Sequence, residues 1–447
     1  MSSIAVPVRA PAPASRAARP LSVFLLALPV WWVLGLANLG YFLVAGLMLL
    51  DLLRRRDWRV PRGFGFWLVF MLWVVLSIVM LGLEASGTLV QGVGDRVIPT
   101  IFRIGEYSAC TIMLIWALTL SEEELPTRRL GQLLAVALGW SVVGGIAGLL
   151  APNLQFPSPM ELLLPGGLSQ NPYVSALVHP ATAQVQDLFS GGEGVGRPSA
   201  PYPYTNTWGN ALGILLPFGV ALIADRATRP LVRVAAALGL VVSAVATFVS
   251  ANRGLWLAIV AMAGFFVVLA MARGNRGVIV ATCIGGPMAI IALVATPLGT
   301  ALTERNTSAP SNDIRAFTVA RAVEIATDSP VLGYGSTRAQ LGSSKSIAVG
   351  TSPGCPKCGN MALGTNGQLW FASVGQGFVG AGLFVLFHLA VLWQYRFVRS
   401  PLGVAALTSG VAGLVFIFVY DRTVATGCLS FLTIALLVKV ARQENVA

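Results

Sequence analysis

The chain has 447 residues, of which 55% are hydrophobic and 11% are charged, and its formal net charge is +12. Soluble proteins carry about 25% charged residues, so this composition excludes a water-soluble fold. Apolar runs of about 18 residues or more, long enough for a helix to cross ~30 Å of hydrocarbon, recur along the chain. The strands of a membrane barrel would be short and alternating. The sequence therefore predicts an all-α, polytopic membrane protein.

The basic residues indicate orientation in a membrane rather than nucleic-acid binding. Most of them lie in short clusters between apolar runs, as at residues 54–56. The positive-inside rule places these short loops in the cytoplasm. Residues 1–20, rich in Ala, Pro and Arg, are expected to form a disordered cytoplasmic segment. A single transmembrane domain at 21–441 and a cytoplasmic tail at 442–447 follow.

We expect about twelve spans, which puts both chain termini on the cytoplasmic side. The first two are short, and they could form a weakly inserted hairpin. The predicted spans cover residues 21–36, 39–53, 63–83, 101–120, 130–151, 206–224, 231–250, 254–272, 277–298, 367–393, 401–419 and 423–440.

Two outer segments are long, at residues 152–205 and 299–366, whereas the cytoplasmic loops are short. Loops beyond about 15 residues are usually functional or disordered. The working face is therefore expected outside the cytoplasm, where neither ATP nor nucleotide sugars are present. An enzyme that works there must use a lipid-borne donor.

The outer segment at 299–366 is predicted to contain a helix between Ser311 and Pro330. This helix is too short and too charged to span a membrane, so it should rest on the membrane surface. Arg315 and Arg321 are six residues apart, about 240° around a helix, and do not share a narrow face. Arg321 and Glu324 do share one and could form a pair.

Polar residues also mark the outer ends of several spans. Asn206 and Asn210 are four apart and share a helix face. Thr205 or Asn206 could instead cap that helix. Arg103 and Glu106 are expected to form an intramembrane pair.

The histidines and cysteines give few signals. His388 falls inside a span and is expected to be packed there, whereas the role of His179 in an outer loop is open. Cys355 and Cys358 form a single CPKC motif on the outer side, where a local disulfide would persist. No histidine is near it in sequence, which argues against zinc. Walker, HExxH and GxSxG motifs are absent from the sequence.

Arg253 lies in SANRGLWLA, near the centre of a long apolar run. A guanidinium in hydrocarbon costs several kcal/mol. We therefore interpret the run as two spans joined by a short outer turn, with Arg253 at head-group level at the start of the second. A plain interfacial anchor is the alternative to a binding role.

Four segments together resemble the O-antigen ligase and polymerase superfamily. They are YPYTNTWGNALGILLP, SANRGLWLA, DIRAFTVARAVEIATDSPVLGYG and GQLWFASVGQGFVG. The resemblance implies a GT-C-like membrane glycosyltransferase fold in the bacterial plasma (inner) membrane. It implies transfer of a glycan from a polyprenyl-diphosphate donor, such as undecaprenyl diphosphate, to a hydroxyl on a glycan, glycolipid or protein acceptor. No metal or other cofactor is expected.

Such a transfer builds negative charge on the diphosphate, and an arginine fork meets phosphate oxygens bidentately. The predicted substrate-binding residues are Arg253, Arg315, Arg321, Arg338 and Asn206, with Arg197 as a further candidate. Ligases of the superfamily usually carry a histidine beside an asparagine where this chain has Thr365 and Asn366. The catalytic candidates are therefore Glu324 and Asn366, and His179 is a second candidate for the base.

Two other functions stay open at this point. A flippase or exporter of lipid-linked saccharide would also need arginines that bind a diphosphate, although the long outer segments argue against it. A non-catalytic partner in polysaccharide assembly fits the missing histidine. The sequence does not distinguish ligase from polymerase, because the two differ in the acceptor.

Overall fold

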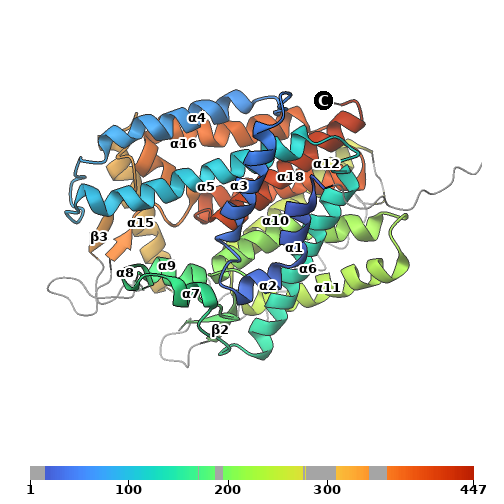
Figure 1. Cartoon of the computed structure of the whole chain (residues 1–447), viewed down its shortest axis with the longest axis horizontal. Coiled ribbons are helices and arrows are strands. Elements are labelled where there is room, and N and C mark those ends of the chain that lie inside the picture. Colours follow the sequence, from blue (N-terminus) through green and yellow to red (C-terminus); the bar gives the residue numbers. More distant parts are fainter. Residues whose placement is uncertain are drawn as a thin grey trace, which may run out of the picture.

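The computed structural model describes residues 16–169, 171–186, 195–274, 277, 309–341 and 360–446. These residues form a bundle of helices with two small antiparallel hairpins (Figure 1). Within them, eight helices are long and apolar enough to cross a membrane: α5 (Val93–Thr119), α6 (Thr127–Leu150), α10 (Thr205–Ala224), α11 (Pro230–Val249), α12 (Arg253–Ala272), α16 (Gln368–Gln394), α17 (Pro401–Val419) and α18 (Val424–Gln443). The predicted all-α, multi-pass membrane fold is confirmed.

The N-terminal part differs from the predicted spans. The expected helix at 21–36 is two short helices, α1 (Arg19–Leu26) and α2 (Leu28–Val33), so the prediction of one continuous helix is wrong. Pro29 has no N–H to continue the ladder of the first helix. α3 (Gly40–Leu53) and α4 (Phe64–Leu76), which continues as the 3₁₀ helix η1 (Ser77–Met80), are apolar but shorter than the eight. Residues 278–298 of the ninth predicted span lie outside the described residues.

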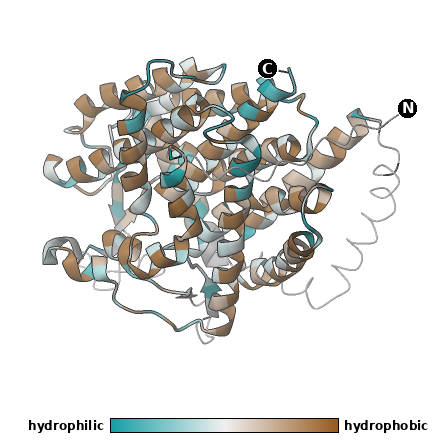
Figure 2. Cartoon of the chain, turned by 45° about the vertical axis from the view of Figure 1, so that its right-hand side comes forward, coloured by the Kyte–Doolittle hydropathy of each residue, from teal (hydrophilic) through white to brown (hydrophobic). Residues whose placement is uncertain are grey.

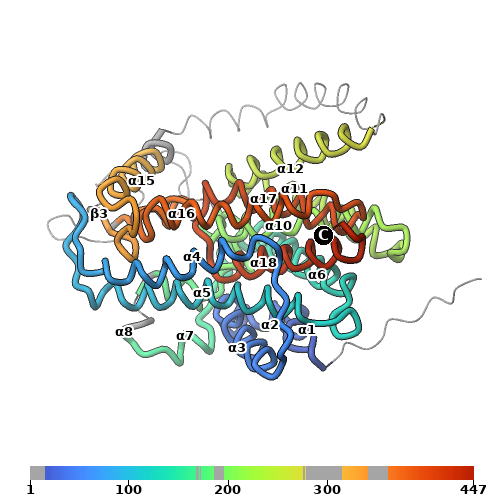
Figure 3. Tube along the Cα trace, turned by 90° about the horizontal axis from the view of Figure 1, so that it is seen from above, coloured from blue at the N-terminus to red at the C-terminus, as the bar shows by residue number. Residues whose placement is uncertain are grey.

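The last helix forms the centre of the bundle. Every residue in the most apolar 18-residue stretch of α18 is buried, and the helix packs against α5, α17, α10 and α6. In the corresponding stretches of α11 and α12, only 17% and 22% of the residues are buried. Figure 3 shows α12 along one edge of the bundle. In Figure 2 the brown of hydrophobic residues predominates along the helices. The outer helices therefore turn most of their apolar surface away from the protein, as helices surrounded by lipid do.

One end of the bundle carries nearly all the remaining structure, and we call it the loop end. It holds α7 (Pro159–Leu163), α8 (Gly166–Ser169), α9 (Pro172–Val178), β1 (Ala183–Gln186), β2 (Val195–Pro198), α15 (Ala309–Asp328), β3 (Ala339–Leu341) and β4 (Asn360–Ala362). In the first hairpin Gln184 lies opposite Arg197. α15 confirms the predicted charged helix, and it ends just before Ser329 and Pro330.

A break in α16 fastens the loop end to the bundle. Gly377 has φ +67° and ψ −179°, which interrupts the helical hydrogen bonds. The segment 330–335 enters this break and binds the freed backbone groups. Three hydrogen bonds do so: Tyr334 N to Val374 O (2.9 Å), Gly335 N to Gly375 O (2.7 Å) and Phe378 N to Pro330 O (2.7 Å).

The approach of these two segments requires glycine on both sides. Gly333 has φ +63°, and a Cβ atom there would lie 2.5 Å from the backbone nitrogen of Gly377. A Cβ atom on Gly377 would lie 2.5 Å from the carbonyl oxygen of Pro330. Because L-residues with a side chain disfavour positive φ and the space is absent, only glycine fits. The segment that follows α15 is thus held by a membrane helix.

Candidate functional site

A continuous series of hydrogen bonds runs across the loop end where α10, α12, α16 and α17 meet. We call it the polar chain, and it comprises Arg197, Thr205, Asn252, Tyr420 and Gln368. Thr205 Oγ1 donates to Arg197 O (3.1 Å), and Asn252 Nδ2 donates to Thr205 O (3.1 Å). The Tyr420 hydroxyl donates to Asn252 Oδ1, and Gln368 N donates to Tyr420 O (2.9 Å). All five residues are buried.

Asn252 sets the start of α12. Its side chain accepts a hydrogen bond from Leu255 N (3.1 Å), the usual arrangement of an N-cap. A Cβ atom on Gly209 would lie 2.2 Å from Asn252 Nδ2, and one on Gly254 would lie 2.5 Å from the Tyr420 hydroxyl oxygen. These close contacts fix the first turn of α12 against α10 and Tyr420.

Arg253 is the first residue of α12, and it is partly exposed. The predicted turn between two spans, with Arg253 at the start of the second, is therefore confirmed. Its two neighbours in sequence both touch Tyr420. A helix N-terminus carries partial positive charge and attracts anions, so the arginine and the helix act in the same direction.

Two further arginines lie near Tyr420. Arg197 is buried on β2, and its Nε donates to Ser250 O (2.7 Å) just before the α12 cap. Arg197 and Arg315 of α15 both lie near enough to Tyr420 to act electrostatically on its hydroxyl. We call Arg197, Arg253 and Arg315 the arginine cluster. Its members come from three segments of the chain, and two of them lie near one tyrosine, which the sequence alone did not reveal.

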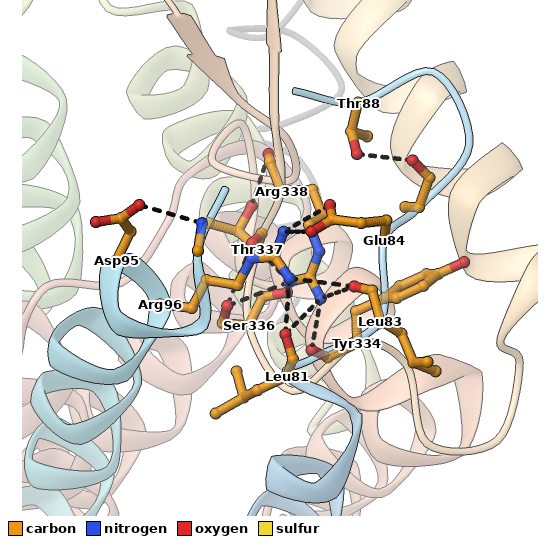
Figure 4. A network of polar contacts seen from close by, with 12 residues as sticks. Leu81, Leu83, Glu84, Thr88, Asp95, Arg96, Tyr334, Ser336, Thr337 and Arg338 are labelled. Carbon is orange, nitrogen blue, oxygen red and sulfur yellow. Dashed lines mark hydrogen bonds and ion pairs between the residues drawn. The ribbon is translucent and has the colours of Figure 1, made fainter. Parts of the chain in front are cut away.

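Arg338 lies elsewhere and has a different environment (Figure 4). Its side chain is completely buried. It donates to the carbonyl oxygens of Leu83 (2.7 Å), Tyr334 (3.1 Å), Ser336 (3.1 Å), Thr337 (3.1 Å) and Leu81 (3.5 Å). Burial and the nearby positive charge of Arg96 lower its pKa to about 10, so it is still charged at neutral pH. These contacts give Arg338 a structural task, and we leave it out of the proposed binding site.

Arg96 completes this network from α5. It donates to Leu81 O (2.7 Å) and forms an ion pair with Glu84 (2.6 Å). Arg96 and Arg338 therefore both bind the segment that follows η1 (Figure 4). Sequence reasoning missed Arg96 and Glu84 because the predicted span began at residue 101. α5 in fact begins at Val93, which places Arg96 in its first turn.

The predicted residues on α15 divide between two faces. Arg321 pairs with Glu324 (2.6 Å), as predicted from their spacing, and donates to Ser86 O. Thr318 is buried and accepts a hydrogen bond from the Asn366 amide, whereas the Glu324 side chain is 64% exposed. The structure therefore brings Asn366 close to the face of α15 that packs on the bundle, and it places Glu324 on the exposed face.

Asn206 and Asn210 lie on the first turns of α10. The N-cap of this helix is Tyr204, without a side-chain hydrogen bond, so the predicted capping by Thr205 or Asn206 is wrong. Gln184 reaches across to accept from Thr205 N instead (2.8 Å). Asn206 is partly exposed. Asn210 is buried and lines a small pocket beneath Tyr420, together with Gln368 and Arg422.

A charged network lies beside this pocket. Arg103 pairs with Glu106 (2.9 Å), as predicted, and with Asp421 (2.9 Å). Arg422 meets His388 Nε2 (3.2 Å), while His388 Nδ1 lies 2.8 Å from Phe384 O. His388 is buried within α16, which confirms the prediction that it is packed. The network ties α5, α16 and the turn before α18 together next to the polar chain.

The predicted disulfide partners Cys355 and Cys358 lie outside the described residues. Within the part of the chain that the structure describes, no three His, Cys, Asp or Glu side chains are grouped as metal ligands. The groups near the polar chain that could contact a ligand are arginine guanidinium groups and side-chain amides. Fixed groups of this kind bind and stabilise an anion.

Comparison with known families supports this picture. Residues 205–354 match the family model of the O-antigen ligases. This match, over about a third of the chain, supports the resemblance to the O-antigen ligase and polymerase superfamily. The matched region spans α10, α11, α12 and α15 and includes two members of the arginine cluster, Arg253 and Arg315. No curated protein matches the chain significantly.

The histidine that the superfamily resemblance leads one to expect is absent from this chain at Thr365 and Asn366. His179, which lies on the loop end, forms a close contact with Glu161, with 2.8 Å between Nδ1 and Oε2. Nothing in the sequence spacing pointed to this pair. The two residues meet because a capping box at Ser158 fixes Glu161 and α9 ends at Val178.

Proposed function

We propose that the protein transfers a glycan from a polyprenyl-diphosphate donor to a hydroxyl acceptor at the loop end. The proposal assigns the loop end to the outer face of a bacterial plasma membrane and both termini to the cytoplasm. The arginine cluster at the N-terminus of α12 is the observation that carries it. The match to O-antigen ligases supports the same reaction class.

In this reaction the bond between sugar C1 and a diphosphate oxygen breaks, and its electron pair goes to the diphosphate. The acceptor oxygen forms the new bond to C1 and loses its proton. Arg253 and Arg315 are proposed to hold the diphosphate oxygens, because fixed cations aimed at developing charge stabilise the transition state. Arg197 donates to Ser250 O just before the α12 cap, and it is proposed to support the start of this helix.

Roles for the predicted residues outside the arginine cluster are secondary parts of the proposal. Arg321 is proposed to bind substrate only if its pair with Glu324 opens. Asn206 and Asn366 are proposed to touch the acceptor or the donor sugar at the rim of the polar chain. Glu324 and Asn366 are the catalytic candidates from the sequence, and Glu324 would have to act from the exposed face of α15. Leaving-group stabilisation by the arginine cluster is thus the main contribution that we propose.

The test uses purified protein in detergent with a lipid-linked glycan and an acceptor. Arg253→Ala should lower kcat about 100- to 1,000-fold, the range seen when one charge-stabilising donor is removed. Its melting temperature should match that of the wild type. Arg128→Ala is the matched control, because Arg128 is an exposed arginine paired with Asp225 at the opposite end of the bundle.

The wild-type protein could make no product in detergent and yet move the lipid-linked glycan across the membrane of vesicles. That result would contradict glycan transfer and indicate a flippase. Unchanged transfer by Arg253→Ala would remove the arginine cluster from the mechanism.

A further inference from the structure

A group of arginines lies at the end of the bundle opposite the loop end. Arg59 and Arg62 belong to the loop between α3 and α4, Arg396 follows the end of α16, and Arg442 lies in the last turn of α18. We call these four residues the basic rim. Their side chains are exposed or partly exposed, and the glycan transfer proposed above has no role for any of them.

Contacts between three segments of the chain hold the basic rim together. Arg442 Nη2 donates to Val60 O (3.3 Å), which places the end of α18 beside the loop before α4 (Figure 1). The Tyr395 hydroxyl, at the end of α16, accepts from Arg62 N (3.0 Å). Arg59 and Tyr395 both lie near enough to Arg442 to act on it electrostatically. The loop before α4 and the ends of α16 and α18 therefore meet at one place.

Carboxylates do not neutralise the positive charge of the basic rim. Among the described residues, none of the four arginines forms an ion pair. Glu444 accepts instead from the backbone nitrogens of Arg399 (2.6 Å) and Ser400 (2.9 Å), and Asp57 is exposed to solvent, where screening weakens its effect. Other acidic groups at this end have their own basic partners: Glu122 pairs with Lys439 (3.1 Å), Glu124 with Arg55 (2.7 Å) and Asp225 with Arg128 (3.2 Å). Positive charge without such partners attracts anions from outside the chain.

Two aromatic rings fix the orientation of Arg396. Its guanidinium carbon lies 3.9 Å from the centroid of a Trp393 ring and 4.1 Å from the centroid of the Phe397 ring. Cation–π contacts of this kind use the flat face of a guanidinium, so its N–H groups lie around the edge and can still donate. One of them donates to Trp393 O. The planar fork suits a phosphate, which parallel N–H groups bind bidentately.

Exposed aromatic rings surround the basic rim at the ends of apolar helices. They are Trp393 (69% exposed), Phe397 (57%), Trp58 (52%) and Phe66 (40%). The first two lie at the end of α16, and the other two flank the start of α4, which packs against α16. Aromatic side chains gather where the hydrocarbon of a bilayer meets its head groups. The position of these rings matches the depth at which lipid phosphates lie.

We propose that the basic rim binds the head group of an anionic phospholipid. The lipid phosphate accepts hydrogen bonds from the guanidinium groups, and the acyl chains lie along the exposed apolar side chains of α4 and α16. Charge complementarity selects an anionic head group, because a zwitterionic one brings its own cation to the arginines. This site goes beyond glycan transfer and does not depend on the proposed function.

Native mass spectrometry of the full-length protein in detergent tests the site by counting bound lipid molecules. The probes are dioleoyl phosphatidylglycerol, which has an anionic head group, and dioleoyl phosphatidylcholine, which has the same acyl chains and no net charge. The first phosphatidylglycerol molecule should bind about tenfold more tightly than the first phosphatidylcholine molecule. Glycerol 1-phosphate at the same concentration should not displace it, because that competitor lacks the acyl chains.

Variants locate the site on the protein. Arg59→Gln and Arg62→Gln should each weaken phosphatidylglycerol binding about fivefold, the contribution of one basic side chain beside an anionic lipid. The hydrogen bonds of these residues come from their backbone nitrogens, to Thr119 Oγ1 (3.1 Å) and the Tyr395 hydroxyl (3.0 Å), so the melting temperature should stay unchanged. Arg226→Gln is the matched control, because it removes one exposed arginine from the loop between α10 and α11 at the same end. It should change binding by less than about twofold.

Three results would overturn the proposal. Equal binding of the two lipids would mean that this surface makes only apolar contact with a bilayer. A loss in Arg226→Gln as large as that in Arg59→Gln would mean that binding follows net charge rather than the basic rim. Displacement by glycerol 1-phosphate would assign the arginines to a soluble anion. If either rim variant fails to fold, the comparison of the two lipids on the wild-type protein and the other variant still decide the question.

Discussion

Two groups of arginines at the loop end differ in their place in the fold and in their surroundings. Arg338 and Arg96 donate to backbone carbonyls, and Arg96 also pairs with Glu84. The arginine cluster is arranged instead around Tyr420 at the start of α12. An arginine saturated by carbonyls fastens one segment to another, whereas arginines gathered at a helix N-terminus can receive an anion. Residue type and loop position alone do not separate the two groups.

The largest expected effect on stability comes from the first group. Arg338→Ala would remove hydrogen bonds to five backbone carbonyls in a buried site. Only the carbonyls of Leu81 and Leu83 would keep Arg96 as a donor. We expect the free energy of unfolding to fall by about 3–5 kcal/mol, as when one partner of a buried charged contact is removed. Denaturant unfolding in detergent measures it. Arg315→Ala is the matched comparison from the arginine cluster. Its free energy of unfolding should stay within about 0.5 kcal/mol of the wild-type value, while its glycan transfer should fall. Equal losses of stability in both variants would contradict the distinction between structural and anion-binding arginines.

The break in α16 allows a second comparison within one helix. Gly377→Ala places a side chain at positive φ and against Pro330 O, which should cost about 2–4 kcal/mol from backbone strain and overpacking together. Amide hydrogen exchange in residues 330–341 should rise as the segment loosens. Gly382→Ala on the same helix meets nothing within 4 Å and should stabilise the protein by up to about 1 kcal/mol. Similar outcomes for the two glycines would contradict the docked segment.

A smaller effect is expected at the centre of the polar chain. Tyr420→Phe keeps the ring but removes the hydroxyl that donates to Asn252. Loss of one such hydrogen bond should cost about 1 kcal/mol. If the bond also holds Arg253 in place, kcat/KM for glycan transfer should fall about fivefold. Tyr395→Phe is the control, because its hydroxyl accepts from Arg62 N at the opposite end of the bundle (3.0 Å). Equal transfer by the two variants would separate Tyr420 from the arginine cluster.

The smallest effect is expected for an arginine outside both groups. Arg55 pairs with Glu124 (2.7 Å) between α3 and the loop before α6. Its hydrogen bonds lower the pKa of Glu124, so this contribution is present above the ordinary carboxyl pKa and is lost as pH falls through the lowered value. Arg55→Ala should cost at most about 1 kcal/mol at neutral pH. Melting curves of wild type and variant should converge in acid. A gap that persists there would mean that Arg55 acts by packing.

The sequence was sufficient for features that depend on composition and local spacing. Apolar runs predicted most of the helices, and the spacing of Arg103 from Glu106 and of Arg321 from Glu324 predicted both ion pairs. Arg253 was placed correctly because a charge in the middle of a long apolar run requires a turn there. These inferences involve residues within about one helical turn of each other.

Contacts between distant segments could not be predicted from one sequence. Arg338 and Arg253 have the same side chain, and only the tertiary structure shows that five carbonyls surround the first. The break at Gly377 is invisible in a run that is apolar on both sides, because the carbonyls it frees are bound by a segment forty residues earlier in the chain. The meeting of His179 with Glu161 depends in the same way on how α7 and α9 are joined.

The docked segment also constrains the order in which the protein is made. Residues 330–335 leave the ribosome before any part of α16, so their binding partner is made only after them. Their backbone N–H groups must stay hydrated until α16 has been inserted with its break at Gly377. Assembly of the loop end is therefore one of the last steps of biogenesis, and a chain truncated before Gly377 would expose α15 without its anchor.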